Sequence, residues 1–131
     1  MKGSRKQKAE VLMQDFFNKA KYGNLVCKGI RKTLHYSQST MAQKLHYGHM
    51  IISDFENDVA MNCDKIYEIY KAYQTVLYEV YAKLDEKDYI LFVLRIICNY
   101  GTVLHEEDKD DDNLVSKFIS ILSGLYSEAA T

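Results

Sequence analysis

The segment "SQSTMAQKLHYGHMIISDFEND", Ser37–Asp58, decides the fold that the sequence predicts. Its first residue is a serine, which is a favourable helix N-cap. Apolar residues then recur at helical spacing up to the bend at residues 46–48, and again from Ile52 to Glu56. Ala42 is small, so two helix backbones can cross closely beside the bend. The pattern therefore predicts two short helices that meet at a steep angle.

Helical spacing continues on both sides of this segment, and the absence of proline favours helices joined by short loops. No strand is predicted, and six or seven helices are expected. They are Lys6–Tyr22 ending at Gly23, Leu25–Leu34, a helix capped by Ser37 that runs to Leu45, one ending near Glu56, a long helix capped by Asn62, one capped by Asp85, and a last one capped by Asn113 after a charged loop. The inward positions of the first and last helices are expected to be Val11, Leu12, Phe16, Ala20, Leu114, Phe118, Ile121, Leu122 and Leu125.

The composition is that of a soluble globular protein of one domain or two tightly joined subdomains. The chain has 131 residues, of which 47% are hydrophobic and 27% charged. Three cysteines without a C-x-x-C pair suit a reducing compartment, and no basic-then-apolar leader opens the chain. The densest apolar run, Tyr89–Cys98, contains Arg95 and is about half the ~20 residues that a membrane span needs. We therefore expect a cytoplasmic protein without a membrane segment.

Charge is unevenly distributed along the chain. The net charge is +4 over Met1–Asn24, +1 over Leu25–Tyr73 and -6 over Gln74–Thr131. A basic head is expected if that end of the protein meets a polyanion. A solvated lysine-rich terminus explains the same distribution equally well.

The stretch "IRKTLHYSQSTMAQKLHYGHMIISDFEND", Ile30–Asp58, followed by "KIYEIYKAY", Lys65–Tyr73, resembles the Xre family of Cro/repressor-type helix-turn-helix proteins. The resemblance covers about Cys27–Tyr73, over a third of the chain. It implies an all-α fold with a Cro/repressor-like helix-turn-helix headpiece and additional C-terminal helices. The matching positions are Arg31, Ser37, Gln38, Met41, Ala42, Leu45, Tyr47, Ile52, Phe55, Glu56, Asn57, Ile66, Ile69 and Tyr73.

Two structural expectations follow from the resemblance. Arg31 and Glu56 are expected to form a charge pair between the first helix of the headpiece and the end of the recognition helix. The family usually has glycine at three bends, where this chain has His35, His46 and Asp58. Each of these three residues is therefore expected to adopt a left-handed conformation, which costs more for a side chain than for glycine.

The resemblance also assigns the residues that would contact DNA. It places Gly48, His49, Met50, Ile51 and Asp54 on the reading face, where amide and guanidinium groups normally read base edges. Here His49 could donate to guanine, Met50 or Ile51 could touch a thymine methyl, and Asp54 would accept only from cytosine and would repel phosphate. The expected contacts outside this face are Gln38 to phosphate or adenine, Lys44, Ser53 and Asn57 to the backbone, and an N-terminal arm of Lys2, Arg5, Lys6 and Lys8 in a groove.

The expected organisation has three parts. Residues 1–24 form a basic arm and helix, residues 25–84 the helix-turn-helix domain with its long following helix, and residues 85–131 a dimerisation or partner-binding region. The expected function is a sequence-specific, repressor-like transcriptional regulator that binds double-stranded DNA as a homodimer, with half-sites about 34 Å apart. A protein or peptide partner of the C-terminal helices is compatible with this function.

Catalytic and metal sites are not predicted. No nucleophile-base-acid set or phosphate-binding loop is apparent, so no enzyme activity and no cofactor are expected. The spacings of Cys27, His35, His46, His49 and Cys63 match no standard zinc pattern. The stretch "DKDDDN" begins like a calcium loop but lacks the glycine and the final acid, so we expect no metal there.

The alternative function is a protein-interaction module, such as an antirepressor or inhibitor, on a helix-turn-helix scaffold that no longer reads DNA. Two features favour it. The reading face has few of the groups that recognise bases, and the chain has eleven tyrosines, five of them in the expected long helix. Tyrosine is enriched at protein interfaces. We expect some of these tyrosines in the core and others at a partner surface.

Overall fold

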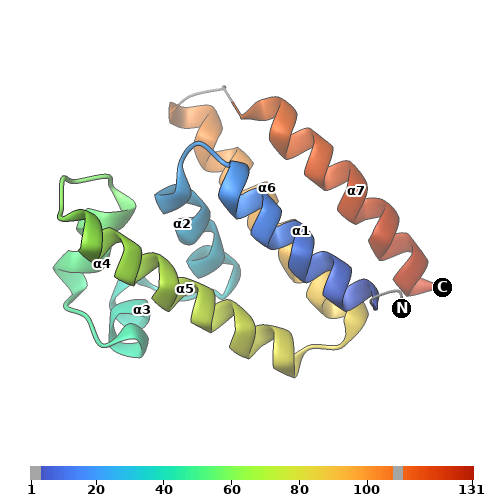
Figure 1. Cartoon of the computed structure of the whole chain (residues 1–131), viewed down its shortest axis with the longest axis horizontal. Helices are drawn as coiled ribbons and strands as arrows, with labels where there is room; N and C mark the ends of the chain where they lie inside the picture. The colour runs from blue at the N-terminus through green and yellow to red at the C-terminus, as the bar shows by residue number, and fades with distance from the viewer. Residues whose placement is uncertain (1–3, 108–110) are drawn as a thin grey trace.

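The computed structural model of the chain describes residues 4–107 and 111–131. Within these residues the protein consists of seven helices without a strand, which confirms the all-α fold class (Figure 1). The helices are α1 (Arg5–Lys19), α2 (Gly23–Thr33), α3 (Gln38–Leu45), α4 (His49–Glu56), α5 (Cys63–Lys83), α6 (Glu86–Glu107) and α7 (Asp112–Ala130).

Helix α6 is central to the group that it forms with α1, α2 and α7, because it contacts all three of them. Its side of the core includes the dense apolar run of the sequence, and Tyr89 and Tyr100 are fully buried in it. Helices α2 and α6 approach closely at Gly29, where a Cβ atom would lie 3.0 Å from the carbonyl oxygen of Ile96. This close packing fixes α2, which carries Arg31, against the centre of the protein.

The short helices α3 and α4 lie at one end of the molecule, whereas the start of α1 and the end of α7 lie at the other (Figure 1). Helix α5 joins the two halves. The ring of Tyr70 in α5 contacts Phe55 of α4 at 5.3 Å and Phe17 of α1 at 5.6 Å between centroids. The buried side chains form one continuous core that draws on all three expected regions of the chain.

The expected inward faces of α1 and α7 are partly wrong. Val11 is 67% exposed and Ile121 is 43% exposed. The expected inward positions Phe16, Phe118 and Leu122 are confirmed as buried, whereas Val11 and Ile121 lie on the outer side. The buried residues are Ala9, Met13 and Phe16 in α1 and Val115, Phe118 and Leu122 in α7.

Several helix boundaries also differ from the expectation. Gly23 opens α2 instead of ending the first helix, and a Cβ atom there would lie 2.9 Å from the hydroxyl oxygen of Tyr70. Helix α7 begins at Asp112, one residue before the expected cap. Asp111 gives no side-chain cap, since its carboxylate accepts from the backbone N–H of Lys21 and from the Tyr100 hydroxyl.

The caps of the two long helices are confirmed. The side chain of Asn62 accepts from the N–H of Asp64 at 2.7 Å, and that of Asp85 accepts from the N–H of Asp88 at 2.8 Å. The expected charged loop after α6 is shorter than predicted, because α6 continues to Glu107. Residues 108–110, which hold half of the "DKDDDN" stretch, lie outside the described residues.

Three fully buried tyrosines couple the stability of the fold to alkaline pH. The hydroxyls of Tyr73, Tyr89 and Tyr100 donate to carboxylates of Glu56, Glu10 and Asp111. Burial, and then the neighbouring carboxylate, raises the pKa of each hydroxyl well above its ordinary value of about 10. The folded state therefore holds these protons after the unfolded state has released them.

We expect the free energy of unfolding to be independent of these tyrosines below about pH 10 and to fall above it. Each tyrosine should contribute a slope of about 1.4 kcal/mol per pH unit, because one proton is lost on unfolding. Urea titrations at increasing pH, followed by circular dichroism, would measure the slope. Tyr89→Phe should reduce it by one such increment, and a slope that this variant leaves unchanged would contradict the assignment.

Candidate nucleic-acid interface

The corners that join α2 to α3, α3 to α4 and α4 to α5 share one backbone geometry. His35, His46 and Asp58 have φ angles of 59°, 61° and 58°, which confirms the expected left-handed conformation at all three. After each corner residue, the next N–H donates to the carbonyl five residues back: Tyr36 to Arg31, Tyr47 to Ala42 and Val59 to Asp54. This bond is characteristic of the Schellman motif that ends helices. The repeated motif sets the angles at which α3 and α4 leave their neighbours.

A buried carboxylate, that of Glu56 at the end of α4, fixes these helices to one another. Arg31 of α2 donates from Nε to Oε2 and from Nη2 to Oε1, both at 2.8 Å, so the expected pair is confirmed. The Tyr73 hydroxyl of α5 donates to Oε2 at 2.8 Å, and Gln38 of α3 donates to Oε1 at 3.2 Å. Glu56 is almost completely buried. One carboxylate therefore connects α2, α3, α4 and α5.

The sequence did not reveal two members of this network. Tyr73 was expected only as an apolar position of α5, and Gln38 only as a DNA contact. A buried tyrosine hydroxyl usually has a hydrogen-bond partner, so the inward position of Tyr73 was the available signal. The partner itself depends on how α4 and α5 cross.

The guanidinium of Arg31 also supports the first corner. Its Nη1 donates to the Tyr36 carbonyl at 2.8 Å, just after left-handed His35. Hydrogen bonding to Glu56 raises the pKa of Arg31, although burial acts in the opposite direction. Arg31 therefore remains charged in the folded protein. A buried pair of this kind mainly fixes geometry, since the desolvation of both charges offsets much of their attraction.

The first turn of α4 faces outward. Gly48 is its N-cap and has open space around its Cβ position. His49 is exposed and Met50 is 69% exposed, while Ile52 and Phe55 point into the core. As far as the described residues show, another molecule can therefore reach this turn.

The other expected contacts around α4 are less open. Ile51, Ser53 and Asp54 are half-buried, and the exposed Asn57 donates to the Ser53 hydroxyl at 3.4 Å. Gln38 and Lys44, the expected contact residues in α3, have partners within the protein. The amide of Gln38 donates to Glu56. The Nζ of Lys44 lies 5.1 Å from the ring centroid of Tyr36.

Arg5, Lys6 and Lys8 of the expected N-terminal arm lie in the first turns of α1, which begins one residue before the expected helix start at Lys6. Ser4 and Gln7 form a capping box there, which favours helix at the position where the arm was expected. These residues lie at the end of the molecule opposite α3 and α4 (Figure 1). Lys2 lies outside the described residues.

Arg5 and Lys6 have partners within the chain. Arg5 lies 3.3 Å from a carboxylate oxygen of Glu86 and 3.5 Å from one of Glu128. Lys6 donates to the carbonyl of Leu84, and its Nζ lies 4.6 Å from the ring centroid of Tyr81.

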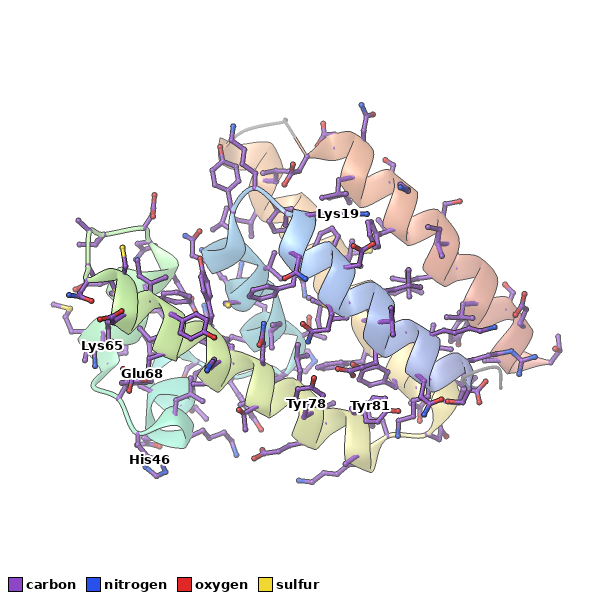
Figure 2. The ribbon with its side chains drawn as sticks, viewed as in Figure 1. Lys19, His46, Lys65, Glu68, Tyr78 and Tyr81 are labelled. Carbon is purple, nitrogen blue, oxygen red and sulfur yellow. The ribbon has the colours of Figure 1, made fainter. Side chains whose placement is uncertain are left out.

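A lysine that the sequence did not single out lies beside the bend between α3 and α4. The Nζ of Lys65 is 5.2 Å from the ring centroid of Tyr47 and 3.4 Å from a carboxylate oxygen of Glu68 (Figure 2). Lys44 and Lys65 are the lysines of residues 37–65, a range that also contains Asp54, Asp58 and Asp64 besides the paired Glu56. The interface is therefore not strongly basic.

Two further findings concern the whole chain. No helix among residues 4–107 and 111–131 combines the length and the apolar character needed to cross a membrane. Comparisons with known protein families, with curated proteins and with solved structures find no match for the chain.

Proposed function

We propose that the protein is a helix-turn-helix transcriptional regulator, repressor-like in its headpiece, that binds double-stranded DNA through α3 and α4. The observation that carries the proposal is the Glu56 network. It joins α2, α3, α4 and α5 into one rigid unit while the first turn of α4 stays exposed. The resemblance to the Xre family, with left-handed corners at the family's glycine positions, supports the same function. The free thiols of Cys63 and Cys98 support a cytoplasmic location.

In this proposal α4 enters the major groove with its first turn. His49 donates to a guanine and Met50 contacts a thymine methyl, the two kinds of contact that their side chains can make. Lys44 and Lys65 neutralise phosphates beside the groove. The small number of cations predicts weak binding to random DNA and a shallow dependence on salt.

Titration of a fluorescently labelled random duplex at increasing salt tests the proposal. Each neutralised phosphate should contribute about -0.9 to the slope of log K against log salt. Lys44→Ala and Lys65→Ala should each flatten the slope by about one phosphate, whereas Lys87→Ala, on α6, should leave it unchanged. Failure of the wild-type protein to bind any duplex at low salt would refute the proposal.

Selection of bound sequences from a random duplex pool tests the role of His49. His49→Ala should relax the preference at one base pair, at a cost of about 1–3 kcal/mol for the preferred site. An identical preference in the two proteins would show that His49 reads no base.

The second candidate function is a protein-interaction module on the same scaffold. Asp54 stands on the expected reading face, and Tyr67 and Tyr78 of α5 are 60% and 55% exposed. Exposed tyrosines of this kind suit a protein surface better than a phosphate backbone. The salt titration separates the two functions, because this candidate predicts no affinity for DNA at low salt.

A further inference from the structure

Helices α1 and α7 lie side by side (Figure 1). Between their outer faces is a groove of about 750 Å³. Its floor is apolar and one end is charged. Val11 and Ile121, the two residues that were expected inside the core, are exposed there. The groove is lined in large part by Lys8, Val11, Leu12, Ile121, Leu125 and Glu128.

The outer face of α7 carries a stripe with a particular order of side chains. Lys117, Ile121, Gly124 and Glu128 are spaced by four, three and four residues, so they lie on one side of the helix. Along this stripe a cation is followed by a large apolar residue, then by a glycine, then by an anion. When two such stripes lie antiparallel, the cation of one is opposite the anion of the other, and the large apolar residue of one is opposite the glycine of the other.

We infer that this face binds a second copy of the same chain, with the two α7 helices antiparallel across a two-fold axis. Lys117 then faces Glu128 of the second copy, and Ile121 packs over Gly124 of the second copy. The two-fold axis repeats both contacts, as an isologous interface requires. The four positions have the spacing of a coiled-coil seam.

The shape of the groove favours this occupant. Nothing lies within 4 Å of a Cβ position built on Gly124, so the side chain of an opposing isoleucine has room there. Val11 of α1 supplies a second apolar wall beside Ile121. In the expected dimerisation region, most apolar residues of α6 are buried within the protomer, whereas α7 exposes Ile121. The inference does not depend on DNA binding.

The charge pairs allow a reversal test in the full-length protein. Sedimentation velocity over a range of protein concentrations should show a reversible dimer for the wild type. Lys117→Glu and Glu128→Lys each place like charges in opposition twice, so each should raise the dissociation constant by about tenfold or more. The double variant restores opposite charges, and its dissociation constant should return towards that of the wild type.

A charge reversal outside the stripe, Lys87→Glu, is the matched control and should leave the dissociation constant unchanged. Because Glu128→Lys also removes the contact of Glu128 with Arg5, the decisive comparison is between Glu128→Lys and the double variant. A double variant that is no tighter than Glu128→Lys would overturn the inferred pairing.

The apolar layer is tested by Ile121→Asp, which should abolish the dimer at concentrations where the wild type is dimeric. Tyr67→Asp makes the same change at an exposed position of α5 and should leave the dimer intact. Circular dichroism checks that both variants are folded, because both side chains are exposed in the protomer. A wild type that sediments as a monomer at all concentrations, or a folded Ile121→Asp dimer, would refute the inference.

Discussion

Replacing Glu56 by alanine should lower the free energy of unfolding by about 3–5 kcal/mol, the cost of leaving one partner of a buried ion pair without the other. The carboxylate accepts two close hydrogen bonds from Arg31 and one each from Tyr73 and Gln38. Its loss leaves the guanidinium buried with only the Tyr36 carbonyl as its remaining acceptor in this network. The loss of stability should therefore exceed that of an ordinary surface substitution several-fold.

Urea denaturation followed by circular dichroism measures this change. Glu68→Ala, an exposed glutamate of α5, is the control and should change the free energy by less than about 0.5 kcal/mol. The double variant Arg31→Met, Glu56→Leu removes both charges and should recover most of the stability, because the buried charge is no longer unpaired. A Glu56→Ala protein within about 1 kcal/mol of the wild type would contradict the structural role of the network.

Phe16→Ala is the second substitution with a large expected effect, a loss of about 3–5 kcal/mol. Phe16 is fully buried where α1 meets α6 and α7. The edges and faces of its ring contact Tyr100 at 5.4 Å and Phe118 at 5.3 Å between centroids. Truncation removes both aromatic contacts and leaves a cavity that three helices would have to collapse to fill.

The same urea titration tests this prediction, with Met50→Ala as its control. Met50 is a large apolar residue too, but it is exposed on α4, so its truncation should change the free energy by less than about 0.5 kcal/mol. Equal losses in the two variants would mean that Phe16 does not hold α1 to the core.

The sequence predicted the short helices because their caps depend on local chemistry, and the resemblance implied their left-handed corners. Ser37 caps α3 through its own side chain, which accepts from the N–H of Thr40 at 3.0 Å. His46 ends that helix in a left-handed conformation that only a few residue types adopt readily. The cap at Ser37 requires no knowledge of the rest of the chain, whereas the conformation of His46 was expected from the resemblance.

The buried faces of α1 and α7 were less predictable, because apolar residues occupy more of the circumference of each helix than the core covers. Val11, Leu12 and Met13 are consecutive, so helical spacing alone cannot decide which of them faces inward. The fold buries Met13 completely and leaves Val11 exposed.

The interface was predicted in part. The pair of Arg31 and Glu56 came from the resemblance, but Tyr73 and Gln38 joined it through the crossing of α4 with α5 and α3. A partner of this kind is set by tertiary geometry, which single-sequence spacing does not contain. The place of Lys65 beside the bend is also set by tertiary geometry, because it depends on where α5 begins relative to Tyr47.

The buried carboxylate has a consequence for whatever molecule docks on α4. Four helices share a single anchor, so α4 has little freedom to tilt or to slide by itself. In the proposed function, a ligand of α4 meets a preorganised surface, and the entropy lost on association is confined to exposed side chains such as Met50. Recognition is then of the lock-and-key type: shape errors must be absorbed by the ligand, by bending or by local melting, and not by the protein.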